Sequence, residues 1–593
     1  MSIWYAKPIG LGGNVWQAAD FTTPSGSPAV DSGSYAVTGQ PATILRSKLI
    51  QADAGAYSVT GESADIAKNK VVVAASGAYS LSGQTAELVK DVVLSADSGA
   101  YATTGQTATL LRSKLIQSVA GAYSVTGQTA NITQGFLLSS ATGSYSVAGQ
   151  AASIVYAASY EITADSGSYS VTGQAATLLK TKVVTAVNGT YAVTGQNADL
   201  SRSYATLANN GTYDVTGQIA DVIYTPANAY VITADAGSYA VTGQAATIFY
   251  GAGYEITADS GSYAVTGQTA AVLLGYTLSA NNGTYVVTGQ SATLLKTKVV
   301  TAVNGAYALT GQAATVAASK LITANNGTYA VTGQTAAVLL GYTLSANNGP
   351  YAVTGQAATV QKSNILLAGS GSYAVTGQAA EIVYAQPNNY ELTADAGSYS
   401  VTGQAATVAA SKRIIAANGS YAVTGQAAAV IYGNVLTADV GSYIVTGQSA
   451  DIFKGRVLEA GAGSYAYLGE DAVLVRGRVL PAAYGSYTVT GQNAAVTYGY
   501  TFPADNGTYA VTGQISDILA SRVLFCATGL YYVIGRQAHI AVSWAVIDDR
   551  QNANWQNIDS PQTAGWQNTA NPQTASWGAV DTDQIPSWQQ VIN

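Results

Sequence analysis

The sequence predicts an all-β protein built as an elongated array of repeats that resembles a β-solenoid. Three observations predict this class. A tyrosine recurs in 23 copies from Tyr35 to Tyr531, and most successive copies share one spacing of about 22 residues. Apolar and polar residues alternate with a period of two within each copy, which is typical of strands. Two glycines stand at fixed offsets in every copy and mark turns or bends of the backbone.

The first half of each unit follows the pattern Tyr-Ala-Val-Thr-Gly-Gln-x-Ala-x-Leu. Tyr and Val at offsets 0 and 2 share one face of a strand, whereas Ala and Leu at offsets 7 and 9 share that face only if one extra residue intervenes. We therefore expect a bulge or bend at the Gly-Gln pair. The residues that define this pattern are taken as candidate structural residues in two representative copies: Tyr35, Gly39, Gln40, Tyr169, Gly173 and Gln174.

The second half of each unit is predicted to be a shorter strand, such as the Val-rich run at 182–186, followed by an Asn, Asp or Ser before a glycine. That glycine fits a tight turn, and we expect positive φ at the conserved glycines, because glycine alone adopts it without cost. Four intervals exceed the common spacing by an even number of residues, with insertions such as 156–160 at the mid-unit turn. Even insertions preserve which face each side chain occupies.

Three architectures can hold such units. In a β-solenoid each unit is one coil, and 23 coils at roughly 4.8 Å each give a rod of about 110 Å. In tandem β-sandwiches several units would build each domain, and the four longer intervals would then be expected to follow a longer-range period, which they do not. The sequence favours the solenoid, and an intertwined trimeric β-fibre, in which three chains share each layer, stays open.

Three regions are predicted along the chain. Residues 1–30 belong to no repeat and form an attachment or capping segment that would cover an exposed strand edge. Residues 31–540 are the array of Tyr repeats, and residues 541–593 carry a second repeat with a period of 11. Tryptophan is a large anchor enriched at interfaces. The second repeat is therefore expected to dock or oligomerise through Trp544, Trp555, Trp566, Trp577 and Trp588.

The composition argues against several functional classes. Only 9% of residues are charged and the net charge is -7, so nucleic acid is not an expected partner. Apolar runs of about 18 residues are missing, so membrane insertion is not expected. With one cysteine (Cys526) and one histidine (His539), Cys/His metal sites, cofactors and His-dependent catalysis are not expected. Calcium at the Asp/Asn turns is disfavoured because many turns carry one carboxylate or none.

A stripe of Lys, Arg and Tyr at the mid-unit turn, as at Lys180, Lys182 and Tyr250, could contact a polysaccharide or a neighbouring chain. Charge spaced along the turn would equally keep a weakly charged rod soluble. The stretch 1–20 lacks a basic segment followed by an apolar one, so an export signal is not expected. This favours a virus component, which is released by lysis, over a secreted adhesin.

The Gly-Ser-Tyr-Ser-Val-Thr-Gly-Gln-Ala-Ala unit at 167–176 and the Trp-Gln-Asn-Ile-Asp-Ser-Pro-Gln-Thr run at 555–563 resemble repeat proteins encoded among the structural genes of tailed bacteriophages. The resemblance implies a non-enzymatic fibre or appendage on the virion surface that gives reach and host-surface adhesion. Its expected partners are other virion proteins of the capsid, neck or tail, a host-surface glycan and further copies of itself. The alternatives are a bacterial matrix or pilus-like fibre and, more weakly, a polysaccharide-degrading spike.

Overall fold

The computed structural model describes residues 34–542 and three short strands before them, apart from residue 41 and short segments that fall mainly at the mid-unit turns. Most of the predicted N-terminal segment and everything from residue 543 onward lie outside the described residues. The chain divides into two compact units, 1–312 and 313–593. Every element of the described part is a β-strand.

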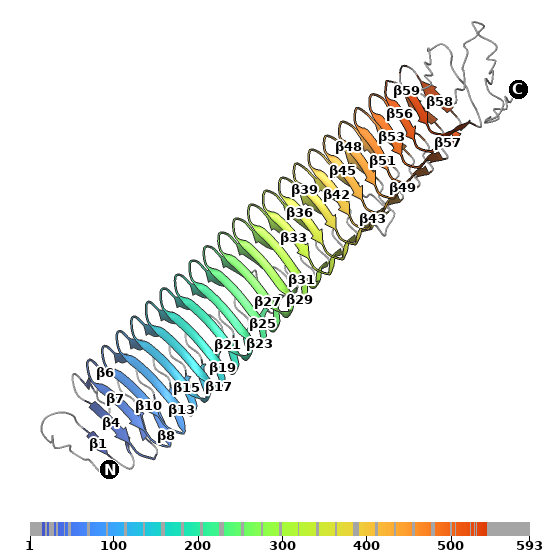
Figure 1. Ribbon diagram of the computed structural model, residues 1–593. Coiled ribbons are helices and arrows are strands. Elements are labelled where there is room, and N and C mark those ends of the chain that lie inside the picture. Colours follow the sequence, from blue (N-terminus) through green and yellow to red (C-terminus); the bar gives the residue numbers. More distant parts are fainter. Residues whose placement is uncertain are drawn as a thin grey trace, which may run out of the picture. The chain divides into compact units, whose positions relative to one another are not determined.

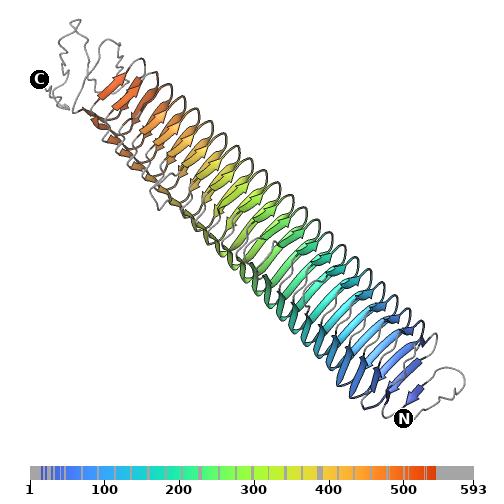
Figure 2. The same ribbon diagram turned by 180° about the vertical axis from the view of Figure 1, so that it is seen from behind.

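Each unit is a stack of parallel coils (Figures 1 and 2). One coil contributes a long strand, or two consecutive shorter ones, to a first sheet, here the Tyr sheet. It then contributes a shorter strand to a second sheet, here the Val sheet. Tyr, Val and Thr are enriched in strands because their side chains fit a pleated, half-buried surface, which explains the choice of strand over helix.

The strands of the first unit, together with β31, which begins in the first unit and ends in the second, fall into these two sheets. The Tyr sheet contains β1 (Val15–Gln17), β2 (Phe21–Thr22), β4 (Ser34–Thr38), β5 (Ala42–Leu45), β7 (Ala56–Thr60), β8 (Ser63–Ala67), β10 (Ala78–Ser82), β11 (Thr85–Val89), β13 (Ala100–Leu111), β15 (Ala122–Thr133), β17 (Ser144–Val155), β19 (Ser168–Leu179), β21 (Thr190–Ser201), β23 (Thr212–Tyr224), β25 (Ser238–Tyr250), β27 (Ser262–Leu273), β29 (Thr284–Leu295) and β31 (Ala306–Ala317). The Val sheet contains β3 (Ala29–Val30), β6 (Leu49–Ala52), β9 (Val71–Ala74), β12 (Val93–Ala96), β14 (Leu115–Ser118), β16 (Leu137–Ser140), β18 (Glu161–Ala164), β20 (Val183–Ala186), β22 (Ala205–Ala208), β24 (Tyr230–Ala234), β26 (Tyr254–Ala258), β28 (Thr277–Ala280) and β30 (Val299–Ala302).

The second unit repeats the arrangement, with the long strand divided at Gly-Gln. Its Tyr sheet contains β33 (Thr328–Thr332), β34 (Thr335–Leu339), β36 (Pro350–Thr354), β37 (Ala357–Gln361), β39 (Ser372–Thr376), β40 (Ala379–Val383), β42 (Ser398–Thr402), β43 (Ala405–Ala409), β45 (Ser420–Thr424), β46 (Ala427–Ile431), β48 (Ser442–Thr446), β49 (Ser449–Phe453), β51 (Ser464–Leu468), β52 (Asp471–Val475), β53 (Ser486–Thr490), β54 (Asn493–Thr497), β56 (Thr508–Thr512), β57 (Ile515–Ser521), β59 (Leu530–Ile534) and β60 (Gln537–Val542). Its Val sheet contains β32 (Leu321–Ala324), β35 (Thr343–Ala346), β38 (Ile365–Ala368), β41 (Glu391–Ala394), β44 (Arg413–Ala416), β47 (Val435–Ala438) and β50 (Val457–Ala460), and β55 (Thr501–Ala504) pairs with β58 (Val523–Cys526).

Successive coils pair in parallel and in register. Between β19 and β21 the partners are Tyr169 with Tyr191 and Gly173 with Gly195, so equivalent residues lie directly above one another. This confirms the predicted β-solenoid. Tandem sandwiches and an intertwined trimer are excluded within each unit, because the described layers pair in parallel with the next layer of the same chain. The longer coils keep this register, since Tyr213 pairs with Tyr239 across one of the longest intervals.

The core lies between the two sheets and is repeated in every coil. Tyr and Val from the first half of the long strand, Ala and Leu from its second half, and two residues of the Val sheet all point inward. In the coil of β19 and β20 these side chains are at most 1% exposed: Tyr169, Val171, Ala176, Leu178, Val184 and Ala186. The Tyr rings form a buried ladder, and the rings of Tyr145 and Tyr169 stack with centroids 4.7 Å apart and planes 1° from parallel. Each such contact stabilises the stack by about 0.5–1.5 kcal/mol beyond area burial.

Of the predicted bulge or bend at Gly-Gln, the structure shows the bend. Between β13 and β15 the register runs through Gly105 and Gly127, skips the glutamine, and resumes at Thr107 with Thr129. The inward face therefore changes parity after the glycine, so that Tyr101 is buried before it and Ala108 is buried after it. One extra residue lets both halves of the long strand face the core.

The expectation of positive φ is wrong at repeat glycines such as Gly195, Gly217 and Gly243, which are not in the left-handed region. A Cβ at Gly217 would instead lie 2.6 Å from the carbonyl oxygen of Gly195 and 2.9 Å from that of Ile219. Glycine is required because stacked coils bring backbone against backbone, which is the close-approach use of glycine in strands.

Candidate functional surface

Two shallow grooves follow the turn that precedes the Tyr, one in each unit. The groove of the first unit has a volume of about 790 Å³ and runs from Ala54 to Thr190. The groove of the second unit, about 920 Å³, runs from Asn348 to Thr508. In both grooves each coil supplies a variable residue, a glycine and then a small residue, usually serine, threonine or alanine. The lining is therefore uncharged and repeats once per coil.

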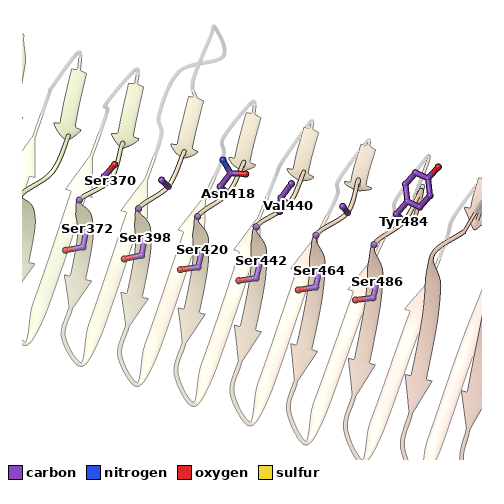
Figure 3. Close-up of a pocket in the computed structure, with 18 of the residues that line it drawn as sticks. Ser370, Ser372, Ser398, Asn418, Ser420, Val440, Ser442, Ser464, Tyr484 and Ser486 are labelled. Carbon is purple, nitrogen blue, oxygen red and sulfur yellow. The ribbon is translucent and has the colours of Figure 1, made fainter.

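Hydrogen bonds between consecutive turns keep these triplets in register. The backbone N–H of Ser420 donates to the carbonyl oxygen of Gly397 at 3.0 Å, and that of Asn418 donates to the carbonyl oxygen of Asp395 at 2.6 Å. Because each turn is bonded to the turn below it, equivalent side chains form columns. Figure 3 shows one column in the second unit: Ser372, Ser398, Ser420, Ser442, Ser464 and Ser486.

The variable position of the triplet differs from coil to coil. In the second unit it includes Val440 and Tyr484, which stand beside the serine column in Figure 3 and are 65% and 74% exposed. An exposed aromatic ring offers an apolar face and a polar tip, and serine hydroxyls both donate and accept hydrogen bonds. This combination suits a neutral, hydroxyl-rich ligand such as a saccharide.

Carboxylates interrupt the outer surface of the Tyr sheet in a few coils. Asp199 and Asp221 are partners in adjacent strands and both are half-buried. Burial, followed by the negative charge of Asp221, raises the pKa of Asp199. Burial also raises the pKa of Asp221, while a hydrogen bond from Thr247 opposes the shift. The pair is a local electrostatic penalty on folding at neutral pH.

Turn amides form a second kind of column. Asn210 donates from Nδ2 to Oδ1 of Asn188 at 3.1 Å, and Asn281 donates in the same way to Asp259 at 2.6 Å. The Asp259 carboxylate, one of the turn acids considered for calcium, thus accepts a hydrogen bond from the next coil. Among the described residues, no three His, Cys, Asp or Glu side chains gather where they could hold a metal ion.

The structure places the candidate repeat residues in distinct environments. Tyr169 is buried in the Tyr ladder, and Gly173 lies between Gly149 and Gly195 of the adjacent coils. Gln174 is exposed at the bend, as is Gln40 beside the partly exposed Gly39. The strand of Tyr35 pairs in register with that of Tyr57. Thus Tyr and Gly serve the stacking, whereas Gln faces solvent.

Other sequence candidates fall elsewhere. His539 is exposed on β60. The tryptophans proposed for docking, Trp544, Trp555, Trp566, Trp577 and Trp588, lie outside the described residues, and so do the cationic side chains of the mid-unit stripe. Sequence reasoning missed Val440 and Tyr484. Both could have been found in the sequence, because most coils have a small or amide residue directly before the turn glycine and these two coils do not.

Comparison with protein-family models, curated proteins and solved structures found no match. In the described part of the chain, no helix has the length and apolar character needed to cross a membrane.

Proposed function

We propose that this chain is a non-enzymatic structural protein of a bacteriophage virion, an appendage that supplies reach and contacts the host surface. The observation that carries the proposal is that each coil contributes the same set of apolar core residues and lengthens the stack by one strand spacing. The Tyr centroids of neighbouring coils, such as Tyr239 and Tyr263, are 4.7 Å apart, close to the strand spacing of a sheet. The length of each unit therefore increases by the same amount with every added repeat.

The surface chemistry supports a binding role more than a catalytic one. The grooves are lined mostly by small uncharged residues, and carboxylate pairs such as Asp199 and Asp221 lie on the outer surface of the Tyr sheet. The virion assignment rests on the resemblance of the repeat to structural repeat proteins of tailed phages. The adhesive part of the proposal assigns the host-surface glycan to the groove of the second unit, with Tyr484 as its aromatic contact.

Intact virions provide the test. Gold label directed to residue 593 is expected on the exterior of purified particles, and particles lacking the chain are expected to attach poorly to host cells. Label on the surface of uninfected bacteria, with none on virions, would support the matrix-fibre alternative and overturn the proposal.

The spacer role is tested by deleting whole coils. Removal of residues 263–306 joins Ser262 to Tyr307 and takes out two units. This variant is expected to fold, and its first unit is expected to be about 10 Å shorter than that of the parent. Deletion of residues 263–295 removes one and a half units and breaks the register, so it serves as the matched control. Equal length of the two-coil variant and the parent would refute the spacer role.

A further inference from the structure

Eight turns contain an Asn followed by a Gly, and all eight asparagines are exposed while the glycines that follow them are buried. Asn-Gly is a chemically labile pair. The backbone nitrogen of Gly attacks the side-chain carbonyl carbon of Asn, a new C–N bond closes a cyclic imide, and the amide leaves as ammonia with the transferred proton. One water then opens the ring to Asp or isoaspartate. The eight asparagines are Asn188, Asn210, Asn282, Asn304, Asn326, Asn348, Asn418 and Asn506.

Hydrogen bonds restrain both reacting groups at Asn348. Its Nδ2, the leaving group, donates to Oδ1 of Asn326 in the preceding coil at 2.9 Å. The backbone N–H of Gly349, the nucleophile, donates to the carbonyl oxygen of Asn325 at 2.5 Å. Ring closure must break both hydrogen bonds before the nitrogen can reach the carbonyl carbon.

Asn418 sits at the same turn position without these restraints. Its neighbours in the column are Ala396 below and Val440 above, and neither side chain can hydrogen-bond. Within the described residues no side-chain hydrogen bond of Asn418 and no backbone hydrogen bond of the Gly419 N–H is found. Figure 3 shows the Asn418 amide projecting beside Val440 at the rim of the groove.

We propose that Asn418 is a site of spontaneous deamidation, whereas Asn348 in the same groove is protected by its neighbours. The product places a carboxylate in a groove that is otherwise uncharged along this column. The isoaspartyl product also adds a methylene to the main chain, next to a glycine whose Cβ position is already filled by the carbonyl of Gly397. Deamidation therefore alters both the charge and the stacking at this coil.

The test measures deamidation at each site by peptide mass spectrometry after incubating the full chain at mildly alkaline pH. Each rate is divided by the rate of the same asparagine in the denatured chain, which removes the effect of the residue after the glycine (Pro350 or Ser420). The normalised rate at Asn418 is expected to exceed that at Asn348 by about tenfold, the factor set by one to two net hydrogen bonds.

The variant Ala396→Asn gives Asn418 a column partner and is expected to slow its deamidation toward the rate at Asn348. It also creates an Asn-Gly pair at 396–397, which is measured as a separate peptide because Lys412 and Arg413 lie between the two sites. Ala396→Val is the matched control: it adds bulk without a hydrogen-bond acceptor and should leave the rate within about twofold of the parent. Circular dichroism verifies the fold of both variants. Equal normalised rates at Asn418 and Asn348, or a folded Ala396→Asn variant with an unchanged rate, would overturn the proposal.

Discussion

Tyr285 shows how two substitutions at one position should act in opposite directions. The ring is fully buried, and its centroid is 4.8 Å from that of Tyr263 and 4.9 Å from that of Tyr307. Its hydroxyl is buried without a hydrogen-bond partner. Burial raises the pKa of Tyr285, so the hydroxyl is protonated at neutral pH. The ring stabilises the stack, whereas the hydroxyl opposes it.

Tyr285→Phe keeps the ring and removes the hydroxyl. An unsatisfied buried polar group costs about 1–3 kcal/mol, so this variant is expected to gain about 1 kcal/mol of local stability. Tyr285→Ala removes the ring and leaves a cavity between Tyr263 and Tyr307. Large-to-small substitutions of aromatic residues cost about 3–5 kcal/mol, so the alanine variant is expected to lose that much.

Amide hydrogen exchange in β27, β29 and β31 is the suitable assay, because repeat arrays open locally and one global unfolding free energy does not describe them. The Phe variant should exchange about fivefold more slowly in these strands and the Ala variant over a hundredfold faster. A Phe variant that exchanges faster than the parent would refute the reasoning, since it would show that the hydroxyl of Tyr285 makes a stabilising hydrogen bond.

Three further predictions concern the backbone, pH and ligand binding. Gly217→Ala is expected to cost more than about 3 kcal/mol of local stability because its Cβ meets three backbone oxygens, whereas Gly369→Ala, whose nearest atom would be 3.1 Å away, should cost far less; amide hydrogen exchange in the adjacent strands measures both losses. The raised pKa values of Asp199 and Asp221 mean that the folded chain binds protons more tightly than the unfolded chain. Local stability should therefore rise as the pH falls from 7 toward the ordinary aspartate pKa of about 3.9, and Asp221→Asn should flatten that profile in the amide hydrogen exchange of β21 and β23; a profile unchanged by the substitution would contradict the assignment. Tyr484→Ala should weaken binding to host glycans by about fivefold or more on a glycan array, with Tyr484→Phe close to the parent; equal binding by all three would remove Tyr484 from the contact.

Much of the fold follows from the sequence because the repeat pattern shows which residues face the core and which strands pair. The parity of Tyr, Val, Ala and Leu within the unit predicts the inward face and also the extra residue at Gly-Gln. Strand pairing follows from the constant interval, since equal intervals permit in-register stacking and even insertions do not disturb it. These are local constraints, and the alternation within the unit together with the spacing between units is enough to detect them.

What could not be predicted depends on contacts between coils. The glycines were assigned to positive φ because a sequence shows which residue lacks a Cβ but not which atom occupies its place. The exposed Tyr484 and the unprotected Asn418 depend on the residues one coil away in the column. The repeat spacing shows which residues are neighbours in the column, but it does not show how far a side chain projects from the turn or which hydrogen bonds it makes.

The near identity of the coils has a consequence for folding itself. A nascent chain that skips one coil still pairs tyrosine with tyrosine and glycine with glycine, so the ladder contacts alone barely distinguish correct assembly from a looped-out turn. The correct assembly is therefore distinguished from a skipped coil mainly by the coils that depart from the pattern. Examples are the coil of Tyr467, which replaces a valine between Val445 and Val489, and the few longer coils. These irregular coils specify the correct register between strands, and a fully uniform array would lack that information.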